Sequence, residues 1–395
     1  MEMTLKTAPY KKTLLTPAGR KVYDVAIVGG GLAGLSLSIQ LAKAGYRVAV
    51  FEKELYPFHK VCGEYISFES WNFLEEAGIP LSDWNLPIIR RLQVSAPNGR
   101  ALLQELPLGG FGISRYKLDA ALAEVARSQG VDLFEQSKVS DVIFGRQQFT
   151  VIGPDFSCQA KLVCGTFGKR SNLDVKWKRS FTRKKSNKLN NFIAVKYHIQ
   201  TDFPPDLIAL HNFSQGYCGI SHIEDNKCCL CYLTTAENLR ISGNSIDNME
   251  QQILQRNPHL QKIFSASLFL YDQPLTISQI SFEKKTQVDN HILLIGDAAG
   301  MIAPLCGNGM SMALHGSKIA FECIQPFLDG TIARHEMEQQ FTDRWNRQFS
   351  KRLQAGRLLQ RFFGSEVFSN FLVRSLEPFP RVITWLIRKT HGAPF

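Results

Sequence analysis

The pattern of hydrophobic and polar positions predicts strand, helix and strand in that order near the start of the chain. Residues 25–28 are an apolar run typical of a buried strand, and residues 35–44 carry apolar side chains at helical spacing. Gly45 is placed to end this helix, and a second strand-like run, 46–52, closes on Glu52. This order is that of a βαβ unit.

The middle of the chain follows a shorter period. Apolar and polar residues alternate in strand-like segments bounded by turn residues, and this alternation predicts an antiparallel sheet. The segments are residues 91–106, 191–200, 216–235 and 270–285. From about Glu336 onward the pattern is helical, and aromatic and aliphatic residues mix with Arg and Lys.

A glycine-rich turn joins the first strand to the first helix. Gly29, Gly31 and Gly34 have the spacing G-x-G-x-x-G. Such glycines permit a tight turn, let the backbone approach a pyrophosphate at the helix N-terminus and allow close helix–strand packing. Glu52, 23 residues after Gly29, is placed to accept hydrogen bonds from an adenosine ribose. The unit predicts FAD or NAD rather than NADP, because the carboxylate would repel a 2′-phosphate.

A second glycine-rich turn lies near residue 300. Residues 292–295 are strand-like, Gly296 and Asp297 end the strand, and a helix is expected from about Met310. With the first turn, this spacing resembles the FAD-dependent flavoprotein hydroxylase and geranylgeranyl reductase superfamily. The resemblance implies FAD as cofactor and Asp297 as its ribityl ligand. It also implies that Gly309 and Met310 provide backbone N–H groups near the flavin ring.

Residues 112–139 extend the resemblance. They are similar to the family's Arg-x-x-Leu-Asp-x-x-Leu helix and the strand after it. The resemblance implies that Arg115 reaches the FAD pyrophosphate or ribityl region. It also implies that Val139, at the end of that strand, packs its backbone against the adenine.

The loop PFHKVCGEYIS, residues 57–67, resembles the loop that the geranylgeranyl reductase branch places beside the flavin. Cys62 and Gly63 are therefore expected to contact the cofactor. Cys62 is the candidate catalytic residue, as a proton donor or an electronic tuner; alternatively it is a small residue chosen for fit. A reactive thiol needs positive neighbours, for which His59 and Lys60 are candidates, and Glu64 is a candidate for orienting the loop.

One motif departs from the family pattern. Hydroxylases usually carry Gly-Ala-Asp-Gly-x-x-Ser-x-x-Arg, which serves both FAD and NAD(P)H. Here Gly165, Gly168 and Ser171 are kept, but Phe167 takes the Asp place and Asp174 the Arg place. Because this motif serves NAD(P)H in the family, its departure leaves two reductants open: NAD(P)H itself or another reduced donor.

The formal charge is +11, and much of it lies in one run. Residues 166–190 hold nine Lys or Arg and a single acid, Asp174. The run, with its basic residues between 169 and 188, predicts either a solvated loop or a docking site for an acidic carrier or electron donor. No nucleic-acid partner is expected, because no recognition motif or aromatic platform accompanies the charge.

The nine cysteines have no repeating spacing and suggest a reducing cytoplasm. Cys228 and Cys231 form a CxxC without a second pair, so no metal site is predicted. No apolar run is long enough for a transmembrane helix. The expected location is cytoplasmic, with the C-terminal segment either capping the core or making peripheral membrane contact.

The expected fold class is α/β: a Rossmann-like FAD-binding domain with an interleaved antiparallel substrate sheet and a helical C-terminal segment. The predicted domains are a flexible tail (1–21), a discontinuous FAD-binding domain (22–85, 110–180 and 285–345), a substrate domain (86–109 and 190–284) and a C-terminal helical segment (346–395). Three side chains are candidates to face the substrate cavity: His198, Tyr217 and His222.

The resemblance implies an FAD-dependent oxidoreductase that acts on a hydrophobic, prenyl or polyketide-derived molecule by hydride transfer through flavin N5. The alternative is a monooxygenase that hydroxylates an aromatic or lipidic phenol through a flavin C4a-hydroperoxide. Halogenation is disfavoured because the Trp-x-Trp-x-Ile-Pro signature is absent. A third interpretation is an FAD-binding protein without catalysis that uses the basic run for a partner.

Overall fold

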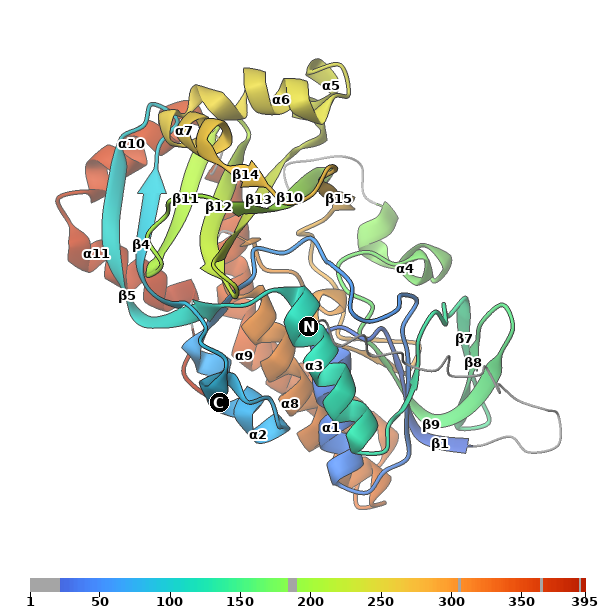
Figure 1. Ribbon diagram of the computed structural model, residues 1–395. Helices are drawn as coiled ribbons and strands as arrows, with labels where there is room; N and C mark the ends of the chain where they lie inside the picture. The colour runs from blue at the N-terminus through green and yellow to red at the C-terminus, as the bar shows by residue number, and fades with distance from the viewer. Residues whose placement is uncertain (1–21, 184–189, 305–306, 363–364, 391) are drawn as a thin grey trace, which may run out of the picture.

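The structure is a computed structural model that describes residues 22–183, 190–304, 307–362, 365–390 and 392–395 (Figure 1). Two sheets form the framework, and the segments that build them alternate along the chain. The predicted fold class is confirmed: a Rossmann-like unit, an interleaved second sheet and a helical C-terminal segment.

The first sheet is parallel at its centre and carries the first glycine-rich turn. Its strands are β1 (Val22–Val28), β2 (Val48–Phe51), β6 (Asp132–Phe134), β7 (Asp141–Gly145), β8 (Gln148–Ile152), β9 (Ser157–Gly165), β16 (Val288–Asp289) and β17 (Ile292–Leu294). The order in space is β16-β17-β9-β1-β2-β6, and the β7–β8 hairpin extends β9. The carboxyl ends of β1 and β17 therefore lie on either side of β9, which brings both predicted cofactor turns to one edge.

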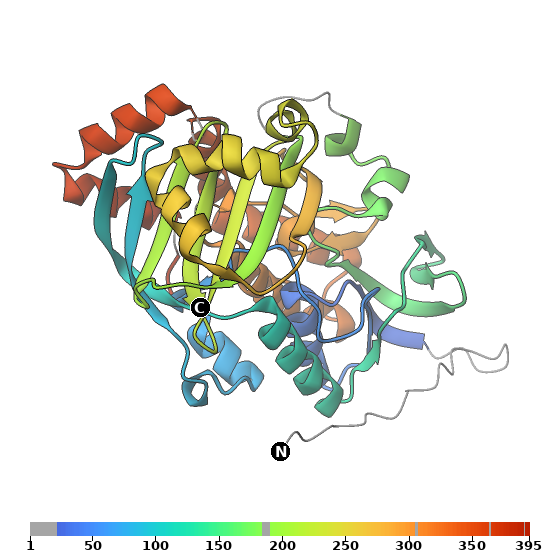
Figure 2. The ribbon, with the colours of Figure 1, turned by 45° about the horizontal axis from the view of Figure 1, so that its top comes forward.

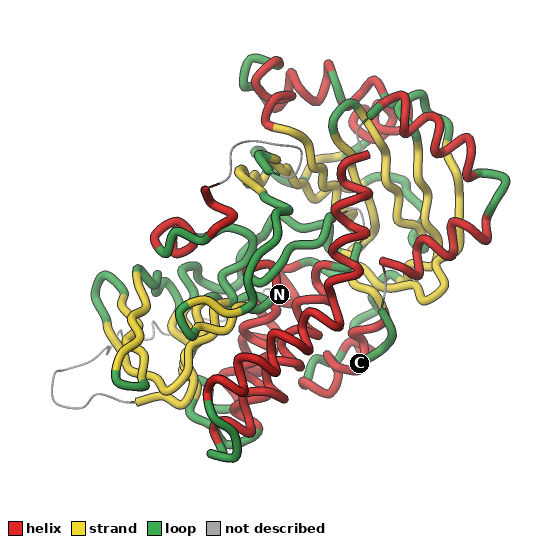
Figure 3. The backbone as a smooth tube through the Cα atoms, turned by 180° about the vertical axis from the view of Figure 1, so that it is seen from behind, coloured by secondary structure: helices red, strands yellow, loops and turns green. Residues whose placement is uncertain are grey.

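Long helices pack side by side against this sheet, as the view from behind shows (Figure 3). They are α1 (Leu32–Lys43), α3 (Arg115–Ser128), α8 (Gly309–Leu328) and α9 (Arg334–Phe362). The first helix begins three residues before the predicted start at Leu35. The glycine-rich turn itself supplies its first hydrogen bond, from Leu35 N–H to the Gly31 carbonyl at 2.9 Å. Gly45, at φ +87°, follows its end as predicted.

The second sheet is antiparallel apart from one pair. Its strands are β3 (Tyr65–Ser67), β4 (Ile88–Ser95), β5 (Ala101–Gly112), β10 (Phe192–Gln200), β11 (Leu207–Phe213), β12 (Gly216–Ile223), β13 (Lys227–Thr235), β14 (Leu268–Phe269) and β15 (Leu275–Ile280). Their order is β14-β10-β13-β12-β11-β4-β5-β3, and β15 pairs with β10. The exception is the parallel pair of β4 and β11, where the early β4–β5 hairpin joins the later strands. Strand β3 lies in the segment 22–85 that was assigned to the FAD-binding domain, but it pairs with β5 of this second sheet. The boundaries proposed between the FAD-binding and substrate domains stay a prediction.

The two faces of β10 have different neighbours. Ile193, Val195 and Ile199 pack under short helices that cross the outer face (Figure 2). These helices are α5 (Ala236–Ile241), α6 (Ile246–Gln252) and α7 (Pro258–Ala266). The intervening residues of β10 face the opposite way, since side chains alternate along a strand, so Lys196 and His198 share one face.

The remaining helices lie at the margins. They are α2 (Trp71–Ala77), α4 (Asn172–Lys176), α10 (Glu366–Leu376) and α11 (Pro380–Thr390). The last two pack on the β4–β5 hairpin through Val373, Ile383 and Ile387. Within the described ranges no helix is both long and apolar enough to cross a bilayer.

Candidate functional site

The first glycine-rich turn contains glycines with two different tasks. A Cβ on Gly34 would lie 2.1 Å from the Gly29 carbonyl oxygen, and one on Gly29 would lie 2.7 Å from the Thr166 carbonyl oxygen. Both glycines are therefore needed for packing. A Cβ on Gly31 would meet nothing closer than Arg115 Nη2 at 3.5 Å and Lys60 Nζ at 3.6 Å. Gly31 thus faces two cations rather than a packed wall.

These two cations are anchored by one carboxylate. Arg115 makes a two-pronged ion pair with Asp119, at 2.7 and 2.8 Å, and Lys60 contacts the same carboxylate at 2.9 Å. Burial alone would raise the pKa of Asp119, but Arg115 and Lys60 outweigh it and hold that pKa below the ordinary value. Two positive groups share one negative group beside Gly31, which fits the chemistry of a pyrophosphate. Arg115 begins α3, so the predicted ligand lies beside the predicted turn.

Glu52 and Val139 lie at the other side of the turn. Glu52 is buried and accepts hydrogen bonds from the Gly30 N–H at 2.8 Å and the Glu54 N–H at 3.1 Å. Val139 is also buried, but it does not end a strand as predicted. Strand β6 ends at Phe134, because the backbone then turns and Ser137 N–H donates to the Glu52 carbonyl at 2.7 Å. The roles of Glu52 and Val139 toward the cofactor stay predictions.

The second turn brings Asp297 next to the start of α8. Asp297 lies in a single helical turn, Gly296–Ala298, and Gly309 and Met310 are the first two residues of α8. Asp297 and Gly309 line the same small hollow. The carbonyl of Asp297 accepts a hydrogen bond from Lys285 at 2.8 Å. Burial lowers the pKa of Lys285 to about 8.

A buried hydroxyl marks the space between the second turn and the second sheet. Tyr65 packs its ring against Gly307, where a Cβ would lie 3.2 Å away. Its hydroxyl is buried and has no hydrogen-bond partner within the described part of the chain. A buried, unsatisfied hydroxyl is unfavourable, so it indicates a place where a ligand or water completes the site. The residues at both turns therefore fit FAD.

Cys62 lies half-buried in the loop between these turns. Its carbonyl accepts a hydrogen bond from the Cys229 thiol at 3.3 Å. Burial and the nearby Lys196 ammonium lower the pKa of His59 to about 4, so that imidazole is neutral near pH 7. Lys60 is paired with Asp119. Neither expected neighbour is thus an unpaired cation, and the catalytic role of Cys62, like the cofactor contact of Gly63, stays a prediction.

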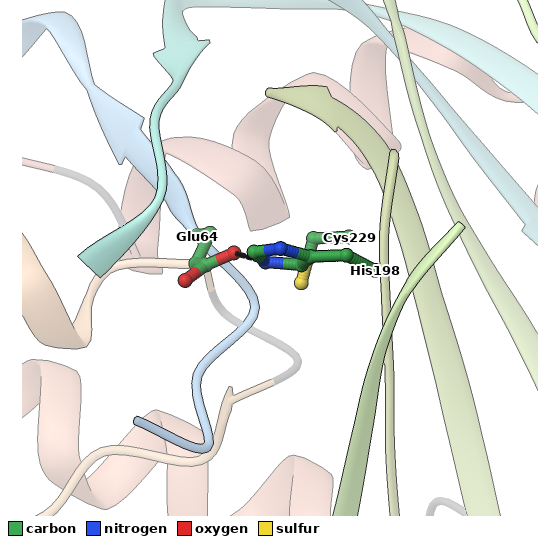
Figure 4. Close-up of side chains that lie close together, drawn as sticks. All are labelled: Glu64, His198 and Cys229. Carbon is green, nitrogen blue, oxygen red and sulfur yellow. Dashed lines mark hydrogen bonds and ion pairs between the residues drawn. The ribbon is translucent and has the colours of Figure 1, made fainter. Parts of the chain in front are cut away.

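The next residue of interest, Glu64, is the centre of a buried polar cluster (Figure 4). Glu64 and Lys196 are fully buried, and their Oε1 and Nζ atoms lie 2.5 Å apart. The other carboxylate oxygen lies 2.6 Å from His198 Nε2, and Arg115 N–H donates to Oε1 at 2.8 Å. Burial alone would raise the pKa of Glu64, but Lys196 and His198 hold it below the ordinary value.

Glu64, His198 and Cys229 place three metal-ligand atom types within 4.8 Å of one another. Lys196 decides against a metal, because its ammonium already neutralises the carboxylate and would repel a second cation. Glu64 also raises the pKa of Lys196 over the opposing effect of burial, which keeps the amine protonated. The cluster is therefore an ion-paired network.

Beside this network lies a buried apolar cluster. It joins the inner face of the second sheet to the Cys62 loop through Val61 and to the second turn through Met301. Its buried sheet residues are Phe192, Ala194, Tyr217, Leu233 and Ile280. Tyr217 is packed in this cluster, and its position toward a substrate stays a prediction. His222 does not belong to the cluster and contacts the Phe203 carbonyl at 2.7 Å.

The basic run is partly folded into the protein. Arg179 is buried, 2.7 Å from Asp174 and 3.0 Å from the carbonyl of Ala298. Lys169 donates to the Val61 carbonyl at 2.9 Å. These residues contact the Cys62 loop and the second turn, so the run is not solvated throughout. Lys184, Lys185 and Lys188 lie outside the described residues.

Sequence reasoning missed the partnership of Glu64, Lys196 and His198. The signal available was a strand, residues 192–200, whose buried pattern is interrupted by a lysine and a histidine two positions apart. Two polar residues on one face of an otherwise apolar strand predict a buried partner, because unpaired buried charge is costly. The sequence does not say which acid is that partner.

The chain is similar in sequence to FAD-dependent oxidoreductases and to several characterised proteins. A family model described as "FAD dependent oxidoreductase" matches residues 24–60, and one described as "Squalene epoxidase" matches residues 220–356. The chain is 26% identical over 360 residues to conditioned medium factor receptor 1 of Dictyostelium discoideum, which covers 83% of this chain and 68% of that protein. It is 24% identical over 356 residues to digeranylgeranylglycerophospholipid reductase of Methanococcus vannielii, covering 83% of each.

Solved structures show the same fold. A geranylgeranyl bacteriochlorophyll reductase-like protein from Thermoplasma acidophilum superposes with a TM-score of 0.77 at 19% identity, covering 95% of this chain and 97% of that one. Flavin-dependent halogenases are also among the structures of similar fold. At these identities the likeness to solved structures establishes the fold alone.

Proposed function

Because this chain belongs to the FAD-dependent oxidoreductase superfamily of flavoprotein hydroxylases and geranylgeranyl reductases, we propose that it reduces a carbon–carbon double bond in a hydrophobic, prenyl or polyketide-derived molecule. The chain is an FAD-dependent enzyme. The observation that carries the proposal is the apolar cluster of Phe192, Ala194, Tyr217 and Leu233, which lies against the Cys62 loop and the second turn. An apolar wall favours a hydrophobic substrate and excludes water.

Each part of the site has a task in this proposal. When bound, reduced FAD supplies the hydride. Arg115 and Lys60 hold the pyrophosphate beside Gly31, and Asp297 holds the ribityl chain. Addition of hydride to an alkene also requires a proton, and the Glu64 network places protonated Lys196 on the same strand face as Ala194 of the apolar cluster.

The monooxygenase alternative needs the same fold and an equally dry pocket. A relative with the name kynurenine 3-monooxygenase, from Flavobacterium psychrophilum, is 22% identical over 330 residues. The buried Lys196–Glu64 pair favours reduction, because hydroxylation by an oxygen adduct places fewer demands on a protein proton donor.

An anaerobic experiment separates the two reactions. The holoenzyme is treated with NADPH and then NADH, and reduction is completed with dithionite, because Phe167 at the usual Asp place disfavours direct nicotinamide use. We expect geranylgeraniol in detergent micelles to reoxidise the flavin without oxygen and to gain two hydrogen atoms. Reoxidation that requires oxygen and yields a hydroxylated product would replace the proposed reduction with the alternative.

The C-terminal helices support peripheral membrane contact. Phe371, Phe379, Val382 and Trp385 are exposed large apolar residues on α10, α11 and their connection. Exposed cations lie among them: Arg374, Arg381, Arg388 and Lys389. Lys389 Nζ lies 5.3 Å from the Trp385 ring centroid. Basic residues mixed with exposed aromatic residues fit an anionic lipid surface.

Vesicle binding tests this contact. We expect the protein to cosediment with phosphatidylglycerol vesicles and to bind less as salt is raised. A Phe379→Ser/Trp385→Ser variant should bind about tenfold more weakly, roughly 1.4 kcal/mol. Leu268→Ser is the matched control, because Leu268 is 62% exposed on the opposite edge of the second sheet. Equal binding by both variants would remove the C-terminal helices from this role.

An acidic carrier or electron donor is the second proposed partner. Among the described residues of the basic run, Lys176 pairs with Asp141 at 2.7 Å, and Arg179 is buried. The docking charge would therefore come from exposed residues such as Arg170 and Lys178.

A further inference from the structure

A continuous chain of hydrogen-bonding side chains leads from the surface to the buried ammonium of Lys196. His59 is half-buried, and both its ring nitrogens lie 3.1 Å from the Tyr271 hydroxyl. That hydroxyl lies 2.7 Å from His198 Nδ1, and His198 Nε2 lies 2.6 Å from Glu64 Oε2. Glu64 Oε1 contacts Lys196 at 2.5 Å, which completes the chain.

We infer that His59, Tyr271, His198 and Glu64 form a proton path that connects solvent to Lys196 beside the Cys62 loop. The path itself is independent of the reaction. Its catalytic use, the reprotonation of Lys196 after it has given a proton to the substrate, rests on the proposed reduction.

The chemical character of each member suits transfer rather than packing alone. A neutral imidazole and a phenol each donate one hydrogen bond and accept another, so both can pass a proton on. Burial and the Lys196 ammonium lower the pKa of His59 to about 4, over the opposing effect of Glu64, so that imidazole is neutral near pH 7. Burial and Glu64 raise the pKa of Tyr271 above its ordinary value, so the hydroxyl keeps its proton.

The burial gradient gives the path a direction. His59 and Tyr271 are half-buried, whereas His198 is 5% exposed and Glu64 and Lys196 are fully buried. A hydrogen-bonded row of five titratable groups is not needed for stability, since apolar replacements of buried ion pairs are often neutral or stabilising. Lys196 also donates to the Lys60 carbonyl at 3.1 Å, which places the inner end on the Cys62 loop.

The proton balance of one turnover is simple. One N–H bond of Lys196 breaks, and its proton forms a C–H bond at the substrate carbon next to the one that receives hydride. The ionised Glu64 carboxylate takes the Nε2 proton of His198 and passes a proton to the amine. His198 takes a proton from Tyr271 at Nδ1, and Tyr271 takes one from His59, which takes one from water. No member of the path is oxidised or reduced.

The decisive measurement is the exchange of the His198 ring N–H with water, observed in the oxidised holoenzyme by NMR with ¹⁵N-labelled histidine. Tyr271→Phe removes only the hydroxyl that links His59 to His198. We expect this variant to slow exchange at least tenfold with full FAD content. The matched control is Tyr116→Phe, because Tyr116 stacks on His59 with ring centroids 4.5 Å apart but lies outside the path; its exchange should stay within twofold.

Exchange that is unchanged or faster in Tyr271→Phe would overturn the path. If the hydroxyl only held the site together, its removal would loosen the site and would not slow exchange. If Tyr271→Phe does not fold, His59→Leu carries the same test from the exposed end. Reoxidation of reduced enzyme by geranylgeraniol should also slow at least tenfold in Tyr271→Phe, with a larger solvent isotope effect. Slowed exchange without any alkene reduction by the wild type would retain the path and reject the proposed function.

Discussion

Replacing Lys196 with methionine is expected to lower the free energy of unfolding by about 3–5 kcal/mol, because removal of one partner of a buried ion pair strands the other charge. Both Lys196 and Glu64 are fully buried. Methionine matches the length of the lysine stem, so lost packing contributes little to the change. Urea denaturation of the purified protein, with and without added FAD, measures the difference.

The control is Lys227→Met. Lys227 lies at the start of β13, its side chain is 35% exposed, and its pair with Asp225 is at the surface. Exposed ion pairs contribute little, so this variant should stay within about 0.5 kcal/mol of the wild type. The double variant Glu64→Leu/Lys196→Met should recover much of the loss, since neither charge then remains. An Lys196→Met variant as stable as Lys227→Met would show that the ion pair is not buried as described.

The second prediction concerns the two kinds of glycine in the first turn. Gly31→Ala should leave the fold intact and weaken FAD binding about 100-fold, roughly 2.7 kcal/mol. The new Cβ would have no protein atom nearer than 3.5 Å, but it would stand between the turn and the cations expected to hold the pyrophosphate. Gly34→Ala should lose both FAD and stability, because its Cβ would lie 2.1 Å from the Gly29 carbonyl oxygen.

Fluorescence titration of the apoprotein with FAD and thermal unfolding separate the two outcomes. Gly145→Ala is the control, because a Cβ there would meet nothing within 4 Å and the residue lies in the β7–β8 hairpin. This control should bind FAD as the wild type does. Full FAD affinity in Gly31→Ala would mean that the pyrophosphate does not approach this turn.

The features that the sequence predicted are those that depend on neighbours along the chain. The turn at Gly29 and the strand–turn–helix around Asp297 are each specified within a short stretch of chain by glycine placement and apolar period. The helix of Arg115 was implied by its resemblance to a family motif. The alternation in residues 191–200 also predicted a strand of the antiparallel sheet. These features follow from local backbone preferences, so they can be predicted without knowledge of the tertiary contacts.

Only the tertiary structure decided which charges meet. Glu64 and Lys196 are separated by 132 residues, and Glu64 and His198 by 134. Arg179 belongs to a run that reads as a solvated loop, yet it is buried against Asp174. A charge is buried only where a partner of opposite sign compensates its desolvation. Arg179 finds that partner five residues away in the chain. The partner of Lys196 and His198 comes from a distant loop, which only the tertiary packing brings against their strand.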